Sequence, residues 1–198
     1  VIRKNRWIID KAKITRQDRN TFYYVSPTTQ QPSDNFGYFL QNDARTLDQL
    51  GEWYYDSASR KLQMYFGKNQ PEKFSVQASV LRSLIVFQGQ QYITVENLAF
   101  EGANGKTVDL SNNANYITLR GCRISYSGEF AVNGNFLHDL TIEKCEISNS
   151  LNTALYIAPF TSALRIVNNT IKNTGLIAGM GANDNQALEG IIVHGQAP

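Results

Sequence analysis

The 198-residue sequence is poor in charge, cysteine and histidine, and it contains no long apolar run. No segment reaches the ~18 apolar residues of a membrane-spanning helix, and none has the order of basic, apolar and small residues that marks a signal peptide. We therefore expect no membrane span. Charged residues make up 18% of the chain and the formal net charge is +2. We also expect no nucleic-acid partner, because nucleic-acid binding needs a concentrated basic face.

The two cysteines, Cys122 and Cys145, are too few for a disulfide-dense scaffold. Neither belongs to a Cys-x-x-Cys pair, so the sequence predicts no zinc site. Basic residues concentrate only in residues 1–20, which hold seven Lys or Arg against two Asp. This stretch predicts a solvated basic edge, with contact to an acidic polymer as the alternative. The composition, 42% apolar and rich in Asn, Tyr, Phe and Gly, favours β structure.

An internal repeat is the strongest signal in the sequence. Four eight-residue segments share apolar residues at positions one, three and eight: Ile93–Phe100, Ile117–Ile124, Leu140–Ile147 and Leu164–Ile171. Their starts are 24, 23 and 24 residues apart. Alternation holds for one pair of residues, breaks across two and then resumes, which is typical of two short strands joined by a tight bend.

A third short strand precedes each of these segments, and one more follows the last. We place its apolar pairs at Leu84/Val86, Val108/Leu110, Phe130/Val132, Leu155/Ile157 and Ile191/Val193. Each coil of three strands can bury its apolar side chains only against its neighbours, so the coils must stack. The sequence therefore predicts an all-β, right-handed parallel β-helix with 23–24 residues per coil.

Position six of the repeat holds Cys122 and Cys145 in adjacent coils, so their Cα atoms should lie one strand spacing, ~4.8 Å, apart. That separation permits a disulfide, but we favour two buried free thiols, because free cysteine behaves as a small apolar residue. Asn97, Asn168 and Asn169 fall at the bend, where an amide side chain can bond to backbone groups of the turn.

Residues 1–80 lack the repeat and form a predicted β-rich N-terminal region, followed by coils over 81–198. Within this region, 52–56 and 61–66 alternate in polarity around a polar turn and predict a β-hairpin. Residues 26–35 are predicted to form a loop, and strands are predicted at 7–9 and 22–25. Because the chain opens without Met and stops just after a strand-like segment, we expect a C-terminally truncated piece of a longer protein.

The hairpin sequence Gly51-Glu-Trp-Tyr-Tyr-Asp56, followed by Lys61-Leu-Gln-Met-Tyr-Phe66 and then by coils, resembles bacterial β-helix proteins of the pectate-lyase-like superfamily. That superfamily includes polysaccharide lyases and β-helical glycoside hydrolases, generally exported or surface-attached. The resemblance covers roughly residues 36–194. It implies a polysaccharide or glycan partner and a secreted or cell-surface location, and it selects no single enzyme family.

Functional residues in stacked coils must lie on outward strand positions or in loops of unequal length. The loop from Ile171 to Ile191 spans 20 residues, whereas the equivalent loops from Phe100 and Ile147 each span 8. The insertion, at 173–189, includes Asn183-Asp184-Asn185. Loops this long are commonly functional or disordered, so a ligand is expected here first.

Two outward rows lie beside this insertion. The first is predicted to hold Asp109, Ala131, Tyr156 and Ile192. The second, one step along each strand, is predicted to hold Ser111, Asn133, Ala158 and His194. Glu129 and Glu189 are expected to flank both rows.

A glycosidase needs two nearby carboxyl groups, whereas a lyase acting on a uronic acid needs a base and a cation or basic group that neutralises the carboxylate. Asp184, Glu189 and His194 are the catalytic candidates. The substrate-binding candidates are Asp109, Tyr156, Asn133 and Glu129. No metal ligand is assigned and no cofactor is identified: Ca²⁺ is one option, but no specific motif supports it.

Each of these residues also has an ordinary interpretation. Asp184 fits a turn better than a metal ligand, because Asn-Asp-Asn favours turns. His194 fits a solvated or capping residue better than a base, and Tyr156 could stack on a sugar ring or pack under a loop. Two functions therefore stay open: a lyase or hydrolase with a groove along the β-helix, and a non-catalytic glycan-binding or adhesion module.

Overall fold

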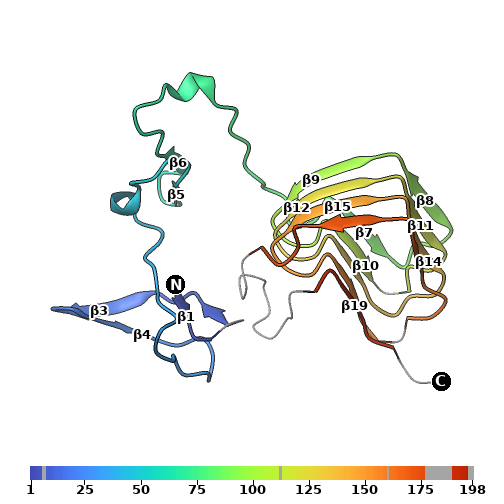
Figure 1. The fold of residues 1–198 in the computed structure, drawn as a ribbon, viewed down its shortest axis with the longest axis horizontal. Coiled ribbons are helices and arrows are strands. Elements are labelled where there is room, and N and C mark those ends of the chain that lie inside the picture. The colour runs from blue at the N-terminus through green and yellow to red at the C-terminus, as the bar shows by residue number, and fades with distance from the viewer. Residues whose placement is uncertain (6–7, 112, 160, 177–188, 196–198) are drawn as a thin grey trace. The chain divides into compact units, whose positions relative to one another are not determined.

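A computed structural model describes the chain as an almost entirely β structure (Figure 1). The described residues are 1–5, 8–111, 113–159, 161–176 and 189–195. They divide into two compact units, one formed by most of the first 77 residues and the other by Ile8 and the residues from Ala78 onward. The predicted domain boundary at residue 80 stays a prediction.

The N-terminal unit consists of short antiparallel pairs. Its strands are β1 (Ile2–Arg3), β2 (Ile9–Asp10), β3 (Ile14–Asp18), β4 (Thr21–Tyr24), β5 (Trp53–Asp56) and β6 (Lys61–Met64), with 3₁₀ turns at Ala44–Thr46 and Pro71–Lys73. β1 pairs with β2, β3 with β4 and β5 with β6. The β5–β6 pair confirms the predicted hairpin. The strand expected at 7–9 is β2, and Trp7 lies outside the described residues.

The second unit is a parallel β-helix whose strands form three sheets (Figure 1). Sheet 1 contains β7 (Ile85–Gln88), β10 (Val108–Ser111), β13 (Val132–Gly134), β16 (Leu155–Ile157) and β19 (Ile191–Val193). Sheet 2 contains β8 (Ile93–Glu96), β11 (Ile117–Arg120), β14 (Leu140–Glu143) and β17 (Arg165–Val167). Sheet 3 contains β9 (Ala99–Ala103), β12 (Arg123–Ser127), β15 (Glu146–Ser150) and β18 (Thr170–Lys172).

The strand register confirms the repeat. Ile117 pairs with Ile93 on one side and with Leu140 on the other, so the first residues of successive repeats stack directly on one another. The bend between sheets 2 and 3 has a left-handed backbone, with φ of 56° at both Asn97 and Asn168. Asn169 accepts a hydrogen bond from the Cys145 backbone N–H at 2.8 Å, as expected for an amide at a turn.

Two predicted positions in sheet 1 are wrong. In β7 the inward residues are Ile85 and Phe87, which pair with Val108 and Leu110, and not Leu84 and Val86. Val86 is 46% exposed, so the predicted phase was off by one residue.

In β13, Val132 and Gly134 take the two inward positions, opposite Val108 and Leu110. Phe130 therefore precedes the strand. The predicted pair Phe130/Val132 was displaced by two residues.

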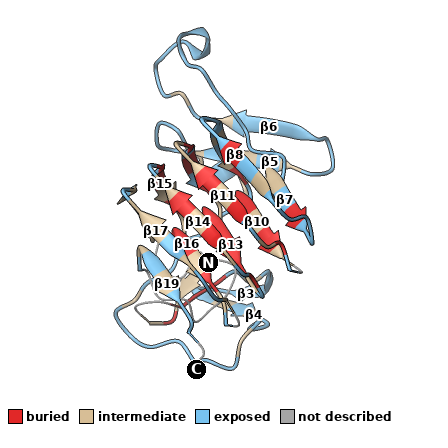
Figure 2. Ribbon diagram, turned by 90° about the vertical axis from the view of Figure 1, so that its right-hand side faces the viewer, coloured by how far each residue is buried: buried red, intermediate tan, exposed pale blue. Residues whose placement is uncertain are grey.

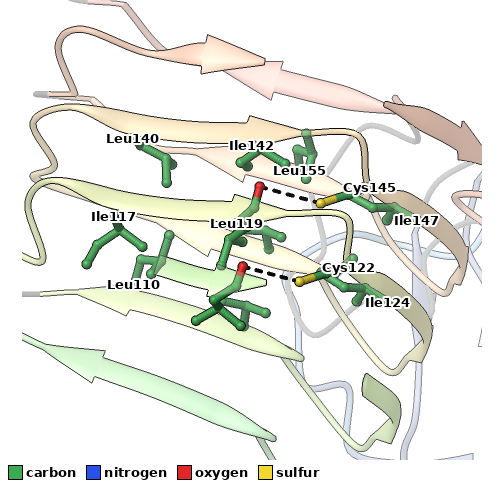
Figure 3. Close-up of a cluster of buried hydrophobic side chains, with 14 of the residues drawn as sticks. Leu110, Ile117, Leu119, Cys122, Ile124, Leu140, Ile142, Cys145, Ile147 and Leu155 are labelled. Carbon is green, nitrogen blue, oxygen red and sulfur yellow. Dashed lines mark hydrogen bonds between the residues drawn. The ribbon is translucent and has the colours of Figure 1, made fainter. Parts of the chain in front are cut away.

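The core lies between the three sheets, and its burial is complete in the middle coils (Figure 2). Leu119, Ile142, Ile147 and Leu155 project into this interior and have no exposed surface (Figure 3). Fully burying such a side chain contributes about 1.5–3 kcal/mol. The stacking of equivalent apolar residues therefore holds the coils together.

Both cysteines are buried and free, as favoured by the sequence. Each thiol donates a weak hydrogen bond to a carbonyl of the preceding coil, Cys122 to Val95 at 3.5 Å and Cys145 to Leu119 at 3.6 Å (Figure 3). Burial raises the pKa of the Cys145 thiol, which keeps it protonated and unreactive.

Lys4 departs from the predicted basic edge, because its side chain is fully buried. Its ammonium group forms an ion pair with Asp10 and donates hydrogen bonds to Ser26 at 2.7 Å and to Thr28 at 3.0 Å. Thr28 in turn donates to the Asp10 carboxylate at 2.9 Å. Part of the N-terminal basic stretch is therefore an internal ion pair.

Gly128 marks a tight contact between coils, and we expect Gly128→Ala to destabilise the β-helix by about 1–3 kcal/mol. A Cβ at this position would lie 2.3 Å from the carbonyl oxygen of Asn104 and 2.6 Å from its carbon, so backbone would have to move. Urea unfolding followed by circular dichroism measures the change. The control is Gly190→Ala, whose Cβ would meet nothing closer than 3.8 Å. Equal midpoints for the two variants would contradict the coil spacing.

Candidate functional site on the outer face of sheet 1

The outer face of sheet 1 carries most of the predicted site residues. Strand register aligns Val86, Asp109, Asn133, Tyr156 and Ile192 in one outward row. Ala131 is not part of this row: it precedes β13 and is fully buried. Asn133 takes its place, so it belongs to the first row and not to the second.

A polar pair lies in this row. The Asn133 amide donates a hydrogen bond to the Asp109 carboxylate at 2.8 Å, and the Lys106 ammonium lies 3.6 Å from the same oxygen. Asn133 is buried, whereas the Asp109 and Lys106 side chains are partly exposed. An exposed ion pair of this length contributes little stability. Asn133 therefore fixes the direction of a carboxylate that stays accessible to a ligand.

An aromatic ridge continues the row towards the last coil. Tyr156 stacks on Phe130, with ring centroids 4.8 Å apart and planes inclined by 15°. The His194 ring meets Tyr156 in an edge arrangement at 5.4 Å. Phe130 is buried and His194 is exposed, so the ridge presents the imidazole and part of Tyr156 to solvent. Both interpretations of Tyr156 thus keep some support, because it packs and is still accessible.

The two flanking glutamates lie just before strands of sheet 1. Glu129 is buried, and its backbone bonds to Gly105 and Asn152 in the adjacent coils at 3.0 and 3.2 Å. Glu189 is exposed and lies two residues before β19. Asp184, with most of the insertion, lies outside the described residues.

The row is long compared with a single catalytic centre. Asp109 and His194 stand on β10 and just after β19, which are three strand positions apart in sheet 1. At ~4.8 Å per strand spacing, about 14 Å separates them along the stack. These two groups therefore cannot act on one bond, although both can contact one extended polymer.

Neither a metal centre nor a membrane span is found in the part of the chain that the structure describes. No three His, Cys, Asp or Glu side chains cluster there in a way that could hold a metal ion. No described helix is long and apolar enough to cross a bilayer.

The sequence interpretation missed one aromatic cluster. Tyr92 and Tyr116 stack at the corner between sheets 1 and 2, next to His138. The signal was present, because both tyrosines stand immediately before the first residue of a repeat.

Comparison with known proteins agrees with this architecture. No curated protein and no solved structure matches the chain. The family described as "Right handed beta helix region" matches residues 74–196, which covers all three sheets and the outward row. The chain therefore belongs to the right-handed β-helix family.

Proposed function

We propose that this protein is a carbohydrate-active protein, a polysaccharide lyase or glycoside hydrolase, that binds its glycan along the outer face of sheet 1. The observation that carries the proposal is the Asp109–Asn133 pair followed by the Phe130–Tyr156–His194 ridge along the stack. A secreted or cell-surface location goes with this substrate class.

The combination of groups suits a sugar polymer. Sugar hydroxyls donate to carboxylates and accept from amides and ammonium groups, and the Asp109–Asn133–Lys106 cluster offers all three. Aromatic surface complements the C–H faces of a pyranose. Because the row repeats at ~4.8 Å, successive groups can meet successive parts of an extended chain.

Within this proposal His194 is the base. Its imidazole is exposed at the end of the ridge, and its backbone N–H is held by the Ile157 carbonyl at 2.8 Å. Histidine is the commonest general base in enzymes, and an imidazole at this position could abstract a proton next to a sugar carboxylate or activate water. Glu189 and Asp184 are the carboxyl groups proposed to act with it. Glu129 is proposed to contact substrate.

A specific observation keeps a second function open. The accessible carboxylate Asp109 lies about 14 Å along the stack from His194, a separation that suits binding at several points better than acid–base chemistry at one. The alternative is therefore a non-catalytic glycan-binding or adhesion module that uses the same face.

We expect His194→Ala to reduce product formation by about 10²–10⁴-fold, the usual contribution of a general base. The assay incubates the protein with polygalacturonate, alginate and xylan and follows unsaturated-product absorbance and reducing ends together. Lys172→Ala, an exposed change on β18, is the control. Full activity of the His194 variant would overturn its role. Binding without product from any polysaccharide would favour the adhesion module.

A further inference from the structure

The corner between sheets 1 and 2 has an unusual choice of residues. A residue in the left-handed backbone region stands immediately before the first residue of each repeat; these are Tyr92, Tyr116, Asp139 and Ala163, with φ of 59°, 57°, 56° and 50°. Left-handed backbone costs roughly 1–2 kcal/mol for most L-residues and much less for Gly or Asn. Two tyrosines at these positions are therefore unfavourable for the backbone alone.

The tyrosine rings form a flat, exposed surface. Tyr92 and Tyr116 stack with centroids 4.4 Å apart and planes within 5° of parallel. Tyr92 is 74% exposed and Tyr116 is 41% exposed. Since so much ring surface stays in water, burial offsets little of the backbone strain. The gain from the stack itself, about 0.5–1.5 kcal/mol, is no larger than that strain.

Polar groups surround the two rings. His138 packs against Tyr116 at 5.8 Å, and its Nδ1 contacts the Asp139 carboxylate. The neighbouring Tyr92 hydroxyl, then burial, then the Asp139 carboxylate raise the pKa of Tyr116. The backbone N–H of His138 is held by the Asn115 side chain at 2.8 Å. Flat apolar faces thus stand beside hydroxyl, carboxylate and imidazole groups.

We infer that Tyr92 and Tyr116 form a second carbohydrate-binding site, in which a pyranose ring stacks on the exposed face of Tyr92. The inference rests on the proposed glycan function and adds a separate point of contact. A pyranose has one flat C–H face ringed by hydroxyls, which matches a flat ring beside polar groups. Tyr156 is less suited to stacking, because Phe130 and His194 both contact its ring.

The corner can serve the same polymer as sheet 1. The chain runs from Asp109 to Tyr116 in seven residues, so at most roughly 25 Å separates their Cα atoms. A polysaccharide on the sheet 1 face can therefore reach the corner. Two weak contacts on one polymer raise its apparent affinity through effective concentration.

The test is affinity gel electrophoresis of the protein through polygalacturonate, alginate and xylan, each cast separately in the gel. The variants are Tyr92→Ala, Tyr92→Phe, Asp109→Ala on sheet 1 and Tyr126→Ala as a matched control. Tyr126 is also exposed, at 56%, with a φ of 57°, but it lies within β12 of sheet 3 and not at the corner between sheets 1 and 2. Urea midpoints of all variants show whether each still folds.

We expect Tyr92→Ala to weaken retardation by about tenfold in the gel that retards the wild type, the effect of losing one aromatic contact. Tyr92→Phe and Tyr126→Ala should keep wild-type retardation. If Asp109→Ala weakens binding while Tyr92→Ala does not, the corner site is overturned and the sheet 1 proposal stands. If no polysaccharide retards the wild type, the proposed function fails first and the corner site fails with it.

Discussion

Ile142→Asp should unfold the β-helix, with a loss of more than about 4 kcal/mol in the free energy of unfolding. Ile142 has no exposed surface and stands between Leu119 and Ile166 in sheet 2, so an aspartate there would bury an unpaired charge in an apolar interior. The free energy of unfolding of a domain is usually about 5–15 kcal/mol, so this change removes much or all of it. Circular dichroism and urea unfolding would measure it.

Thr141→Asp is the matched control for this prediction. Thr141 is the preceding residue of the same strand and faces outward, half-buried, in line with Thr118. We expect a change within about 1 kcal/mol, typical of an outward position. A stable Ile142→Asp protein, or a Thr141→Asp protein that is equally unfolded, would mean that the strand register is wrong.

Asp10→Ala should destabilise the N-terminal unit by about 3–5 kcal/mol, because it leaves the buried Lys4 ammonium without its counter-charge. Ser26 and Thr28 still accept hydrogen bonds from Lys4, but neither supplies a negative charge. Hydrogen exchange followed by mass spectrometry over residues 1–40 would report the loss as faster exchange in β1 and β2.

Two further variants make the result interpretable. Asp18→Ala removes an exposed carboxylate from β3 and should leave exchange in residues 1–40 unchanged. A double Lys4→Met, Asp10→Leu variant removes the whole pair, and it should be more stable than Asp10→Ala, since apolar replacements of buried ion pairs are often neutral or better. If Asp10→Ala exchanges like the wild type, the buried pair is not a stabilising feature of this unit.

The coils of sheets 2 and 3 could be predicted from sequence because their inward and outward residues alternate clearly. Ile117, Leu119 and Ile124 are apolar, whereas the residues between them are polar or small. Only one phase of each strand then buries the apolar side chains. Stacking at 23–24 residues follows directly, and the observed register agrees.

Sheet 1 was harder to predict, for two physical reasons. Leu84–Phe87 is a continuous apolar run, so both phases bury apolar side chains and alternation carries no information. At Gly134 the inward residue has no side chain. The apolar pattern of β13 therefore lacks the residue that would show which positions of the strand face inward. Phe130 was then mistaken for a strand residue, although it packs against Tyr156.

The N-terminal unit shows a different limit. Some of its contacts join residues far apart in the sequence, such as the bridge between Ile2 and Tyr38, and short strands give no pattern that predicts such pairs. Burial of Lys4 is likewise set by partners 22 and 24 residues away, Ser26 and Thr28. Nothing local in the basic stretch distinguishes Lys4 from the exposed Lys11 and Lys13.

For the candidate site, the outward face of sheet 1 could be predicted from sequence, but the contacts between its side chains could not. Asp109 and Tyr156 were expected on one outward row, and the structure aligns them with Asn133 between. The hydrogen bond from Asn133 to Asp109 could not be predicted while Asn133 was placed one row away. The stack of Tyr156 on Phe130 could not be predicted either, because Phe130 was placed inside β13.

A crystal structure with a bound oligosaccharide tests the proposed function most directly. The oligosaccharide should come from the polysaccharide that retards the protein most in the gel. We predict sugar hydroxyls bonded to Asp109 and Asn133, with the chain running along sheet 1 towards His194. An oligosaccharide bound on sheet 2 or sheet 3, with the outer face of sheet 1 free of sugar, would contradict the account.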